Sequence, residues 1–600
     1  MHKTLYYYYV QEEVNLVVGV KKQVDKLKSN LIDIQFVLED AERKQVKDKA
    51  VRVWLDKLKD VCYDIDDVLD EWSYAILTWE MDEENPRSLK KMRCSFMRSP
   101  CFGCNQVVPR RDIALKIKAV SEKLDEIAKE KAMYGFELYK ATDHELLQLS
   151  STSLVDDSSM CGRDEEKKSV VSMLLAKKAT VETLIGRVRH LSMMLSKETS
   201  FPSSIHRAKG VRSLLIDNSG DPWLGAALPD VMKQLTCIRS LNLSWSSIKE
   251  IPKEVGKLIH LRHLNLEWCR ELVSLPETMC DLCNLQSLDV NWCLSLKELP
   301  RAIGKLIKLR HLCIYDSGVA FMPKGIERLT CLRTLDCFMV CGGGENESKA
   351  ANLRELKNLD HIGGRLAIRN LRGGGIEDAA EAPLKNKKGL LCLDLYFNHN
   401  HEDDNLIEVL QPPSDLERLY IKRYGGIVLP NWMMALTRLQ ELVLDKCWNL
   451  EVLPPLGRLP NLESLVLRGL QVRRLDAGFL GIEEVENANI NEGEIARVTA
   501  FPKLKRLTIA SLLEVEEWDG IERRVGEEDA TTTSIFIMPQ LQQLEIDDCP
   551  LLRALPDYVL AARLQELSVQ YCSNLRKRYG KEEKGEDWHM ISHIPKVIFL

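Results

Sequence analysis

One six-residue motif, with apolar residues at its first, fourth and sixth positions, recurs five times in the middle of the chain. The steps between copies are 23, 24, 24 and 23 residues, and the copies begin at Ile238, Leu261, Leu285, Leu309 and Leu332. Each copy is too short to bury its own apolar side, so stacked copies must share one core. The motif therefore predicts strands that lie side by side in one continuous, curved ribbon.

A fixed period of this length with this pattern is typical of the leucine-rich repeat. Leu264 and Leu266 are two residues apart on a strand and should point inward, whereas the residues beside them should face solvent on the concave side. We expect that side to bind a protein partner through His263, Asn265, Glu267, Ser287, Asp289, Asn291, His311, Cys313, Tyr315, Arg418, Tyr420 and Lys422. Five repeats have cysteine at position 9, where a small side chain should turn inward: Cys269, Cys293, Cys447, Cys549 and Cys572.

The repeats become irregular after residue 337. Strands are predicted over 364–371 and 390–395, and a regular step of 23 residues returns in the copies that begin at 416, 439 and 462. The next copy begins 42 residues later. We therefore expect an insertion near 475–500 that interrupts the stacking of the strands.

The amino-terminal part of the chain has a helical pattern. Apolar residues at alternating steps of three and four predict helices over 14–41 and 51–72, joined by a short polar turn. A break over 94–109 contains Pro100 and Pro109, and a further helix is expected from about residue 112. These segments predict an antiparallel helical bundle.

The predicted fold class is therefore α plus α/β solenoid, with a helical bundle followed by a leucine-rich-repeat horseshoe. We expect a helical coiled-coil domain over 1–140, a linker over 141–187 and the repeats over 188–600.

Composition narrows the possible partners. A net charge of -6 and a pI of about 6.1 provide no basic field, so no direct nucleic-acid partner is expected.

The sequence contains no run of 18 apolar residues, so no membrane-spanning helix is predicted, and the first residues lack the features of a signal peptide. The 18 cysteines are spread without a disulfide framework, which indicates reduced thiols. We expect a cytoplasmic location, with the nucleus or the periphery of the plasma membrane as alternatives.

The sequence offers little chemistry for catalysis. It contains no Gly-x-Ser-x-Gly motif, and the Cys280/Cys283 pair lacks the second pair that a zinc site needs. We interpret His260, His263 and His311 as surface polar residues. No catalytic residue, metal or cofactor is expected, and the chain is not predicted to be an enzyme.

Acidic residues form a stripe on the second predicted helix. Asp60, Asp64, Asp67 and Glu71 follow one another at steps of four, three and four, so they lie on one face. Like charges at this spacing repel by about 0.2–0.5 kcal/mol per pair. The stripe is either a solvated acidic face or a surface that docks on a basic partner, such as arginines of the repeats.

Residues 53–70, Val-Trp-Leu-Asp-Lys-Leu-Lys-Asp-Val-Cys-Tyr-Asp-Ile-Asp-Asp-Val-Leu-Asp, resemble the amino-terminal coiled-coil domain of plant coiled-coil nucleotide-binding leucine-rich-repeat immune receptors. Within them, Asp66, Asp67, Val68, Leu69 and Asp70 match the acidic motif of that family. The resemblance implies that this motif packs on arginines of the repeats. It also implies that the repeats recognise a pathogen effector or a guarded host protein, and that a full-length immune receptor is a further candidate partner.

Two features depart from the family. Ten residues stand where family members have a longer apolar first helix, which is associated with membrane insertion, so membrane association by that route is doubtful here. In addition, residues 161–171 resemble the start of the nucleotide-binding domain, but residues 188–191 already resemble the segment before the repeats. No Gly-x-x-x-x-Gly-Lys-Ser/Thr motif is present, so no phosphate-binding loop is predicted.

Three hypotheses follow. The chain is a plant defence receptor or regulator without an ATPase module; or it is a truncated gene model of a receptor switched by ATP and ADP; or it is a repeat adapter unrelated to immunity. ATP or ADP would be a cofactor only if the nucleotide-binding domain were restored.

Overall fold

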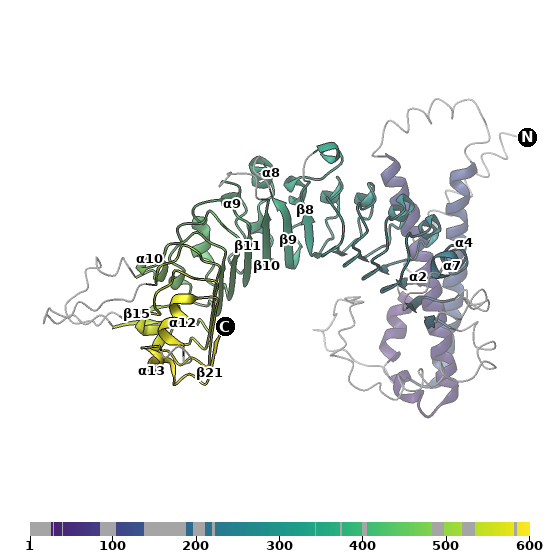
Figure 1. The fold of residues 1–600 in the computed structure, drawn as a ribbon. Coiled ribbons are helices and arrows are strands. Elements are labelled where there is room, and N and C mark those ends of the chain that lie inside the picture. Colours follow the sequence, from purple (N-terminus) through teal and green to yellow (C-terminus); the bar gives the residue numbers. More distant parts are fainter. Residues whose placement is uncertain are drawn as a thin grey trace, which may run out of the picture.

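The computed structural model describes 26–83 (except 28 and 39), 104–136, 188–195, 210–218, 223–341, 344–371, 375–398, 405–482, 497–518, 534–580 and 585–600. A helical domain lies beside one end of a long, curved array of repeats (Figure 1). The predicted linker, the first ten residues and the segment that resembles the start of a nucleotide-binding domain lie outside the described residues.

Among the described residues of the helical domain, three long helical segments pack together. The described residues within 26–44 are helical, and α2 (Lys49–Glu83) and α4 (Cys104–Glu130) follow. The three segments bury one shared core, in which Trp54 is fully buried and its indole N–H donates to the carbonyl of Ile127 at 3.1 Å. Helix α4 begins eight residues before the expected residue 112, so the expected helix break at Pro109 is wrong. Proline removes one backbone donor near the start of the helix without ending it.

All pairings between the named strands that the structure describes are parallel, and two sheets follow each other along the array. The first sheet contains β1 (His190–Leu195), β2 (Ser213–Asn218), β3 (Ser240–Asn242), β4 (His263–Asn265), β5 (Ser287–Asp289), β6 (His311–Cys313) and β7 (Thr334–Leu335). The second contains β8 (Cys337–Met339), β9 (Gly363–Leu371), β10 (Gly389–Phe397), β11 (Arg418–Lys422), β12 (Glu441–Asp445), β13 (Ser464–Arg468), β16 (Arg506–Ala510), β19 (Gln543–Asp547), β20 (Glu566–Gln570) and β21 (Lys596–Phe599).

The insertion after β13 does not interrupt the sheet, so this expectation is wrong. β13 pairs directly with β16, with Ser464 opposite Arg506 and Arg468 opposite Ala510. The extra residues form elements outside the main sheet: β14 (Arg474–Leu475), α10 (Ala477–Leu480) and β15 (Arg497–Ala500). β14 pairs with β17 (Glu517–Trp518), and β15 pairs with β18 (Ser534–Ile537). The backbone donors and acceptors of the insertion are thus partly satisfied by a later repeat.

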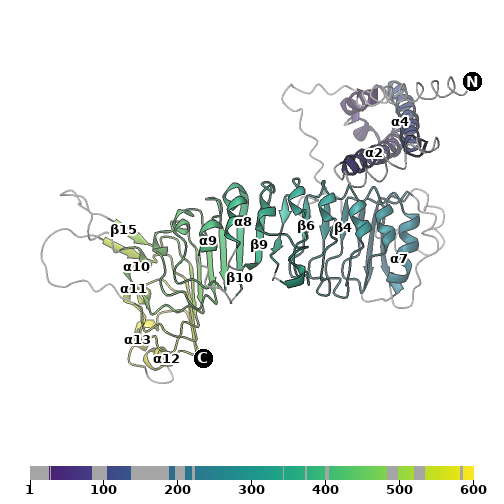
Figure 2. The same cartoon turned by 90° about the horizontal axis from the view of Figure 1, so that it is seen from above.

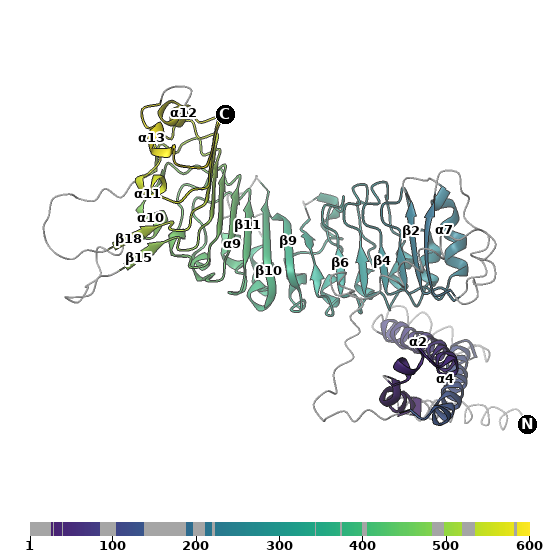
Figure 3. The same cartoon turned by 90° about the horizontal axis from the view of Figure 1, so that it is seen from below.

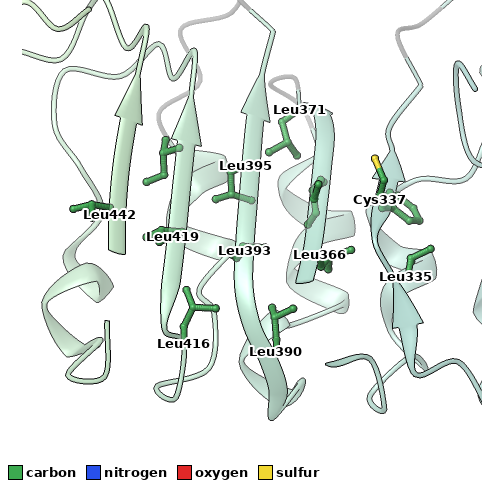
Figure 4. Close-up of a cluster of buried hydrophobic side chains, with 14 of the residues drawn as sticks. Leu335, Cys337, Leu366, Leu371, Leu390, Leu393, Leu395, Leu416, Leu419 and Leu442 are labelled. Carbon is green, nitrogen blue, oxygen red and sulfur yellow. The ribbon is translucent and has the colours of Figure 1, made fainter. Parts of the chain in front are cut away.

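The repeat motif places a column of leucines from each strand in one core. Figure 4 shows Leu366, Leu393, Leu419 and Leu442 on neighbouring strands of the second sheet, and all four are fully buried. The cysteines at position 9 are buried too. Cys293 donates its thiol to the carbonyl of Leu266 at 3.1 Å. Burial raises the pKa of Cys293 to about 12, so it is a structural thiol rather than a reactive thiolate.

Short helices and 3-10 turns form the outer side of the arc, opposite the strands (Figures 1 and 2). The helices are α7 (Trp223–Gln234), α8 (Ile376–Glu381), α9 (Asn405–Val409), α10, α11 (Asp557–Leu560), α12 (Ser573–Tyr579) and α13 (Trp588–Ile591). Among the helices that the structure describes, none is long and apolar enough to cross a bilayer.

Candidate functional site

The acidic side chains of α2 contact two different neighbours. Asp64 pairs with Lys123 of α4 at 3.0 Å, and Glu71 pairs with Lys116 of α4 at 2.7 Å. The remaining acidic residues of the stripe and its flanks face the first repeats. These residues are Asp60, Asp66, Asp67 and Asp70. The stripe therefore divides between holding the bundle together and contacting the repeat array.

Asp66 and Asp67 contact arginines of the first sheet. Arg239 donates to Asp66 at 2.5 Å and to Asp67 at 2.8 Å, and Arg212 also donates to Asp67. The Arg212 side chain is only 5% exposed, so this charge is almost fully removed from water. Such a guanidinium is stable only when a carboxylate compensates it, and removing the carboxylate would leave a buried charge without a partner.

Asp70 is the most enclosed acidic residue of the motif. Its carboxylate accepts from Arg262 at 3.0 and 3.1 Å and lies 3.4 Å from Nδ1 of His260, while its backbone carbonyl accepts from Asn284 at 3.3 Å. Burial alone would raise the pKa of Asp70, but hydrogen bonds to His260 and Arg262 and the charges of Arg262 and Arg239 outweigh burial and lower the pKa. Asp70 is therefore held as a carboxylate.

His260 corrects the sequence interpretation. It was expected to be a surface polar residue, but it is only 5% exposed because α2 covers it. The sequence could not indicate this burial, because it depends on contact between residues 190 positions apart. The other two motif residues divide between core and surface: Val68 is buried in the helical core, whereas Leu69 is 40% exposed.

The arginines share one place in the repeat. Arg189, Arg212, Arg239 and Arg262 each come immediately before a strand, β1 to β4, so they line the same edge of the sheet. The helical domain lies along that edge (Figures 2 and 3). One helical turn rises about 5.4 Å, and neighbouring strands are about 4.8 Å apart. This near match lets acidic residues on successive turns meet arginines on successive strands.

The other predicted residues lie on the exposed face of the sheets. His263, Ser287 and His311 are register partners on β4, β5 and β6, and His311 is 3.0 Å from the hydroxyl of Thr334. Several polar side chains there stabilise the repeat itself. The side chain of Asn265, for example, accepts from the backbone N–H of Glu267 at 2.8 Å.

Asp289 is half-buried in an acidic surrounding. Burial raises its pKa, and the charges of Glu267 and Asp336 raise it further, while a hydrogen bond from the Asn291 backbone opposes them; the result is about 6. No group of His, Cys, Asp and Glu side chains within the described residues could hold a metal ion.

Three residues that the sequence analysis missed connect Tyr315 to Tyr420 and Lys422. They are Arg365, Arg369 and Tyr396. The strands β9 and β10 that carry them lie where the repeat period is irregular, so no regular motif pointed to them. The alternation of outward and inward residues in the predicted 364–371 strand was the available signal.

Comparison with known proteins agrees with both parts of this architecture. A leucine-rich repeat region model matches residues 251–547, and an Rx N-terminal domain model matches residues 7–99. Disease resistance protein RGA2 of Solanum bulbocastanum is 34% identical over 390 residues, which are 62% of this chain and 36% of that protein. The chain is similar to plant disease resistance proteins in both its helical domain and its repeats. The putative disease resistance protein RGA1 of the same species is 34% identical over 54% of the chain and 30% of that protein. The putative disease resistance RPP13-like protein 1 of Arabidopsis thaliana is 32% identical over 58% of the chain and 35% of that protein.

The chain therefore spans about a third of the length of these relatives. Among solved structures, a leucine-rich-repeat protein of Leptospira interrogans is similar, with 20% identity, a TM-score of 0.44 and coverage of 70% of this chain and 98% of that chain. An internalin of Listeria monocytogenes is similar with 17% identity, a TM-score of 0.41 and coverage of 64% and 94%.

Proposed function

We propose that this chain is a plant defence protein that recognises a pathogen effector or a guarded host protein through the exposed face of its repeats. In this proposal, Asp66, Asp67 and Asp70 dock the helical domain on one edge of the array and leave the exposed face of the strands accessible. The observation that carries the proposal is the separation of these two surfaces. The contacts to α2 come from residues at the strand edge, whereas His263, Ser287 and His311 belong to the strand faces.

The exposed face has the composition of a protein-binding surface. It presents tyrosine and arginine together with histidine and asparagine on a rigid ladder of strands, and tyrosine and arginine are enriched at protein interfaces. The proposed face consists of His263, Asn265, Glu267, Ser287, Asp289, Asn291, His311, Cys313, Tyr315, Arg418, Tyr420 and Lys422. A full-length immune receptor is the second proposed partner, and it would bind through the helical domain.

We further propose that the chain acts without its own ATPase, as a regulator, decoy or partner of a complete receptor in the cytoplasm. The lack of a Gly-x-x-x-x-Gly-Lys-Ser/Thr motif supports this part of the proposal. Titration of the chain with a fluorescent ATP analogue should give no saturation at micromolar concentrations, and saturable binding would contradict it.

The truncated gene model is the second candidate, and the short share of the relatives that the chain spans favours it. Amplification of the transcript across the codons for residues 170–190 separates the two. A product that encodes this chain supports a receptor without an ATPase. A product longer by about nine hundred nucleotides, corresponding to two ordinary domains, supports an omitted exon.

Recognition itself is tested by capture from plant extract. The full chain and a variant with His263→Ala, Ser287→Arg and His311→Ala on the exposed face should be used as baits, and bound proteins should be identified by mass. A protein retained by the native chain and lost with the variant supports recognition through this face. Equal retention by both baits would overturn it.

A further inference from the structure

Six side chains form one stacked cluster on the exposed face near the middle of the array. They come from the end of β6 and from β9, β10 and β11, and we call them the Arg–Tyr cluster: Tyr315, Arg365, Arg369, Tyr396, Tyr420 and Lys422. Three of the six come from the irregular β9–β10 region, which separates the regular repeats on either side.

Cations and aromatic rings alternate within the cluster. The guanidinium of Arg369 lies 4.8 Å from the ring centre of Tyr315 and 5.1 Å from that of Tyr396. On the other side of Tyr396, the ammonium of Lys422 lies 4.8 Å from the ring centre and donates to the tyrosine hydroxyl at 3.1 Å. Arg365 lies 4.9 Å from the ring centre of Tyr315. These distances are those of cation–π contacts.

Carboxylates hold the two arginines in place from the side. Arg365 donates to Asp394 at 2.6 Å, and the Asp394 side chain is only 1% exposed. Arg369 donates to Asp316 at 2.8 Å. Because stacking and ion pairs fix both side chains before any partner arrives, binding to them would cost little conformational entropy.

The band of strands around the cluster carries excess positive charge. In the six neighbouring strands β9, β10, β11, β12, β13 and β16, the positions on the outward-facing side of the sheet contain six cations and three carboxylates, an excess of three positive charges. The cations are Arg365, Arg369, Arg418, Lys422, Arg468 and Arg506, and the carboxylates are Asp394, Glu441 and Asp445. Of these carboxylates, Asp394 is already paired with Arg365. Arg418 is exposed and has no ion pair among the contacts of the described residues.

Acidic residues border this band on both sides. Glu267, Asp289 and Asp336 lie towards the first repeats, and Glu545 and Asp547 lie on β19. Six strands about 4.8 Å apart make the basic band roughly 25 Å wide. A short acidic segment fits within that width, whereas a long polyanion such as RNA would extend over the acidic borders and be repelled.

We propose that the Arg–Tyr cluster, with Arg418 beside it, is the part of the recognition face that binds a short acidic segment of a partner protein through aspartate or glutamate carboxylates. The inference rests on the proposed function, because it assumes that the exposed face recognises a protein. Carboxylates of the partner pair with Arg418 and Lys422, and its apolar atoms pack on the tyrosine rings.

The test uses the full chain and three ten-residue fluorescent peptides that alternate alanine with glutamate, glutamine or lysine. Fluorescence anisotropy at about 50 and 150 mM NaCl gives the dissociation constants. The glutamate peptide should bind at least about tenfold more tightly than the other two, and more weakly at the higher salt. Arg418→Gln with Lys422→Gln should weaken its binding about tenfold or more.

A matched control removes the same charge from the outer side of the same region: Lys385→Gln with Lys388→Gln should change binding less than about twofold. Tyr396→Leu keeps every charge but removes the ring between Arg369 and Lys422, so it should weaken binding about threefold. Equal affinity for the glutamate and glutamine peptides, or an equal loss in the outer control, would overturn the inference. Tighter binding of a twenty-nucleotide single strand than of the glutamate peptide would overturn it too.

This test is separable from that of the proposed function. Suppose that the glutamate peptide binds no more tightly than the glutamine peptide, while the variant at His263, Ser287 and His311 no longer captures a protein that the native chain retains. That pair of results would contradict the acidic-segment inference and would still support recognition through the exposed face.

Discussion

Arg262 and Asp70 are 192 residues apart in the chain, yet Nη2 of Arg262 donates to both carboxylate oxygens of Asp70 at 3.0 and 3.1 Å. The Asp70 side chain is 12% exposed and that of Arg262 is 26% exposed, so both charges have lost most of their water. The pair links the helical domain to the fourth strand of the first sheet. Its removal should therefore affect the association of the two parts more than the stability of either one.

The first prediction concerns that association. Asp67→Asn with Asp70→Asn should weaken it by about 2–5 kcal/mol, because Arg212 and Arg262 would remain desolvated without their carboxylates and Arg239 would keep only Asp66. A protease recognition sequence inserted near residue 155 allows the chain to be cut, and size-exclusion chromatography at about 150 mM NaCl then reports whether the parts stay together. The native parts should co-elute, and the variant parts should separate.

The control changes two acidic residues of the same helix that face α4 instead. Asp64→Asn with Glu71→Gln removes the same charge but breaks the pairs with Lys123 and Lys116. These parts should still co-elute. If both variants behave alike, helix charge rather than specific pairing governs the association.

The second prediction concerns the close stacking of repeats on the outer side. A Cβ atom added to Gly256 would lie 2.5 Å from the carbonyl oxygen of Thr278 in the next repeat. Gly256→Ala should therefore lower the free energy of unfolding by about 1–3 kcal/mol. Gly225→Ala is the matched control, because no atom lies within 4 Å of its added Cβ and the residue is in helix α7. Thermal unfolding should show a lower midpoint for the first variant and an unchanged or higher one for the second.

The third prediction concerns Asp289, whose pKa of about 6 lies above the ordinary value of 3.8. A raised carboxyl pKa stabilises the fold at low pH, and that contribution is lost as pH rises through about 6. The shift corresponds to at most about 3 kcal/mol, and partial exposure reduces this to about 1–2 kcal/mol. Asp289→Asn should therefore be more stable than the native chain at about pH 7.5, and the difference should shrink at about pH 4.5. A difference in thermal midpoint that does not vary with pH would contradict this.

The fourth prediction concerns Lys387, a fully buried lysine whose ammonium donates to the carbonyls of Leu356 and Leu359 at 2.8 and 3.1 Å. Lys387→Met keeps much of the volume but leaves both carbonyls without this donor. The expected loss is about 1–3 kcal/mol. Its exposed neighbour provides the comparison, because Lys388→Met should change the midpoint of chemical denaturation little. Equal effects at the two positions would show that the buried hydrogen bonds contribute nothing.

The repeat spacing predicted the solenoid because each strand position repeats with a fixed chemical pattern. The irregular strands at 364–371 and 390–395 were also predicted, and β9 and β10 confirm them. Pairing across the insertion was not predictable, because the sequence shows the extra residues but not that they leave the plane of the sheet. The early start of α4 was missed because proline was interpreted as a helix end.

Charge contacts were harder to derive than strands. The acidic stripe on α2 was visible, but the division of its residues between α4 lysines and repeat arginines depends on how the helix is rotated. The arginines themselves carry a periodic signal, since Arg212, Arg239 and Arg262 hold the same place before consecutive strands. The burial of His260 had no such signal.

The direct pairing of β13 with β16 has a consequence for how this molecule can change. The repeat motifs of β13 and β16 begin 42 residues apart, whereas those of β12 and β13 begin 23 residues apart. Both pairs of strands nevertheless align the same positions of the motif opposite each other. Length can thus be added on the outer side of the arc while the strands of the inner side keep their register. The outer side tolerates new segments, and the inner side can acquire new specificity one substitution at a time.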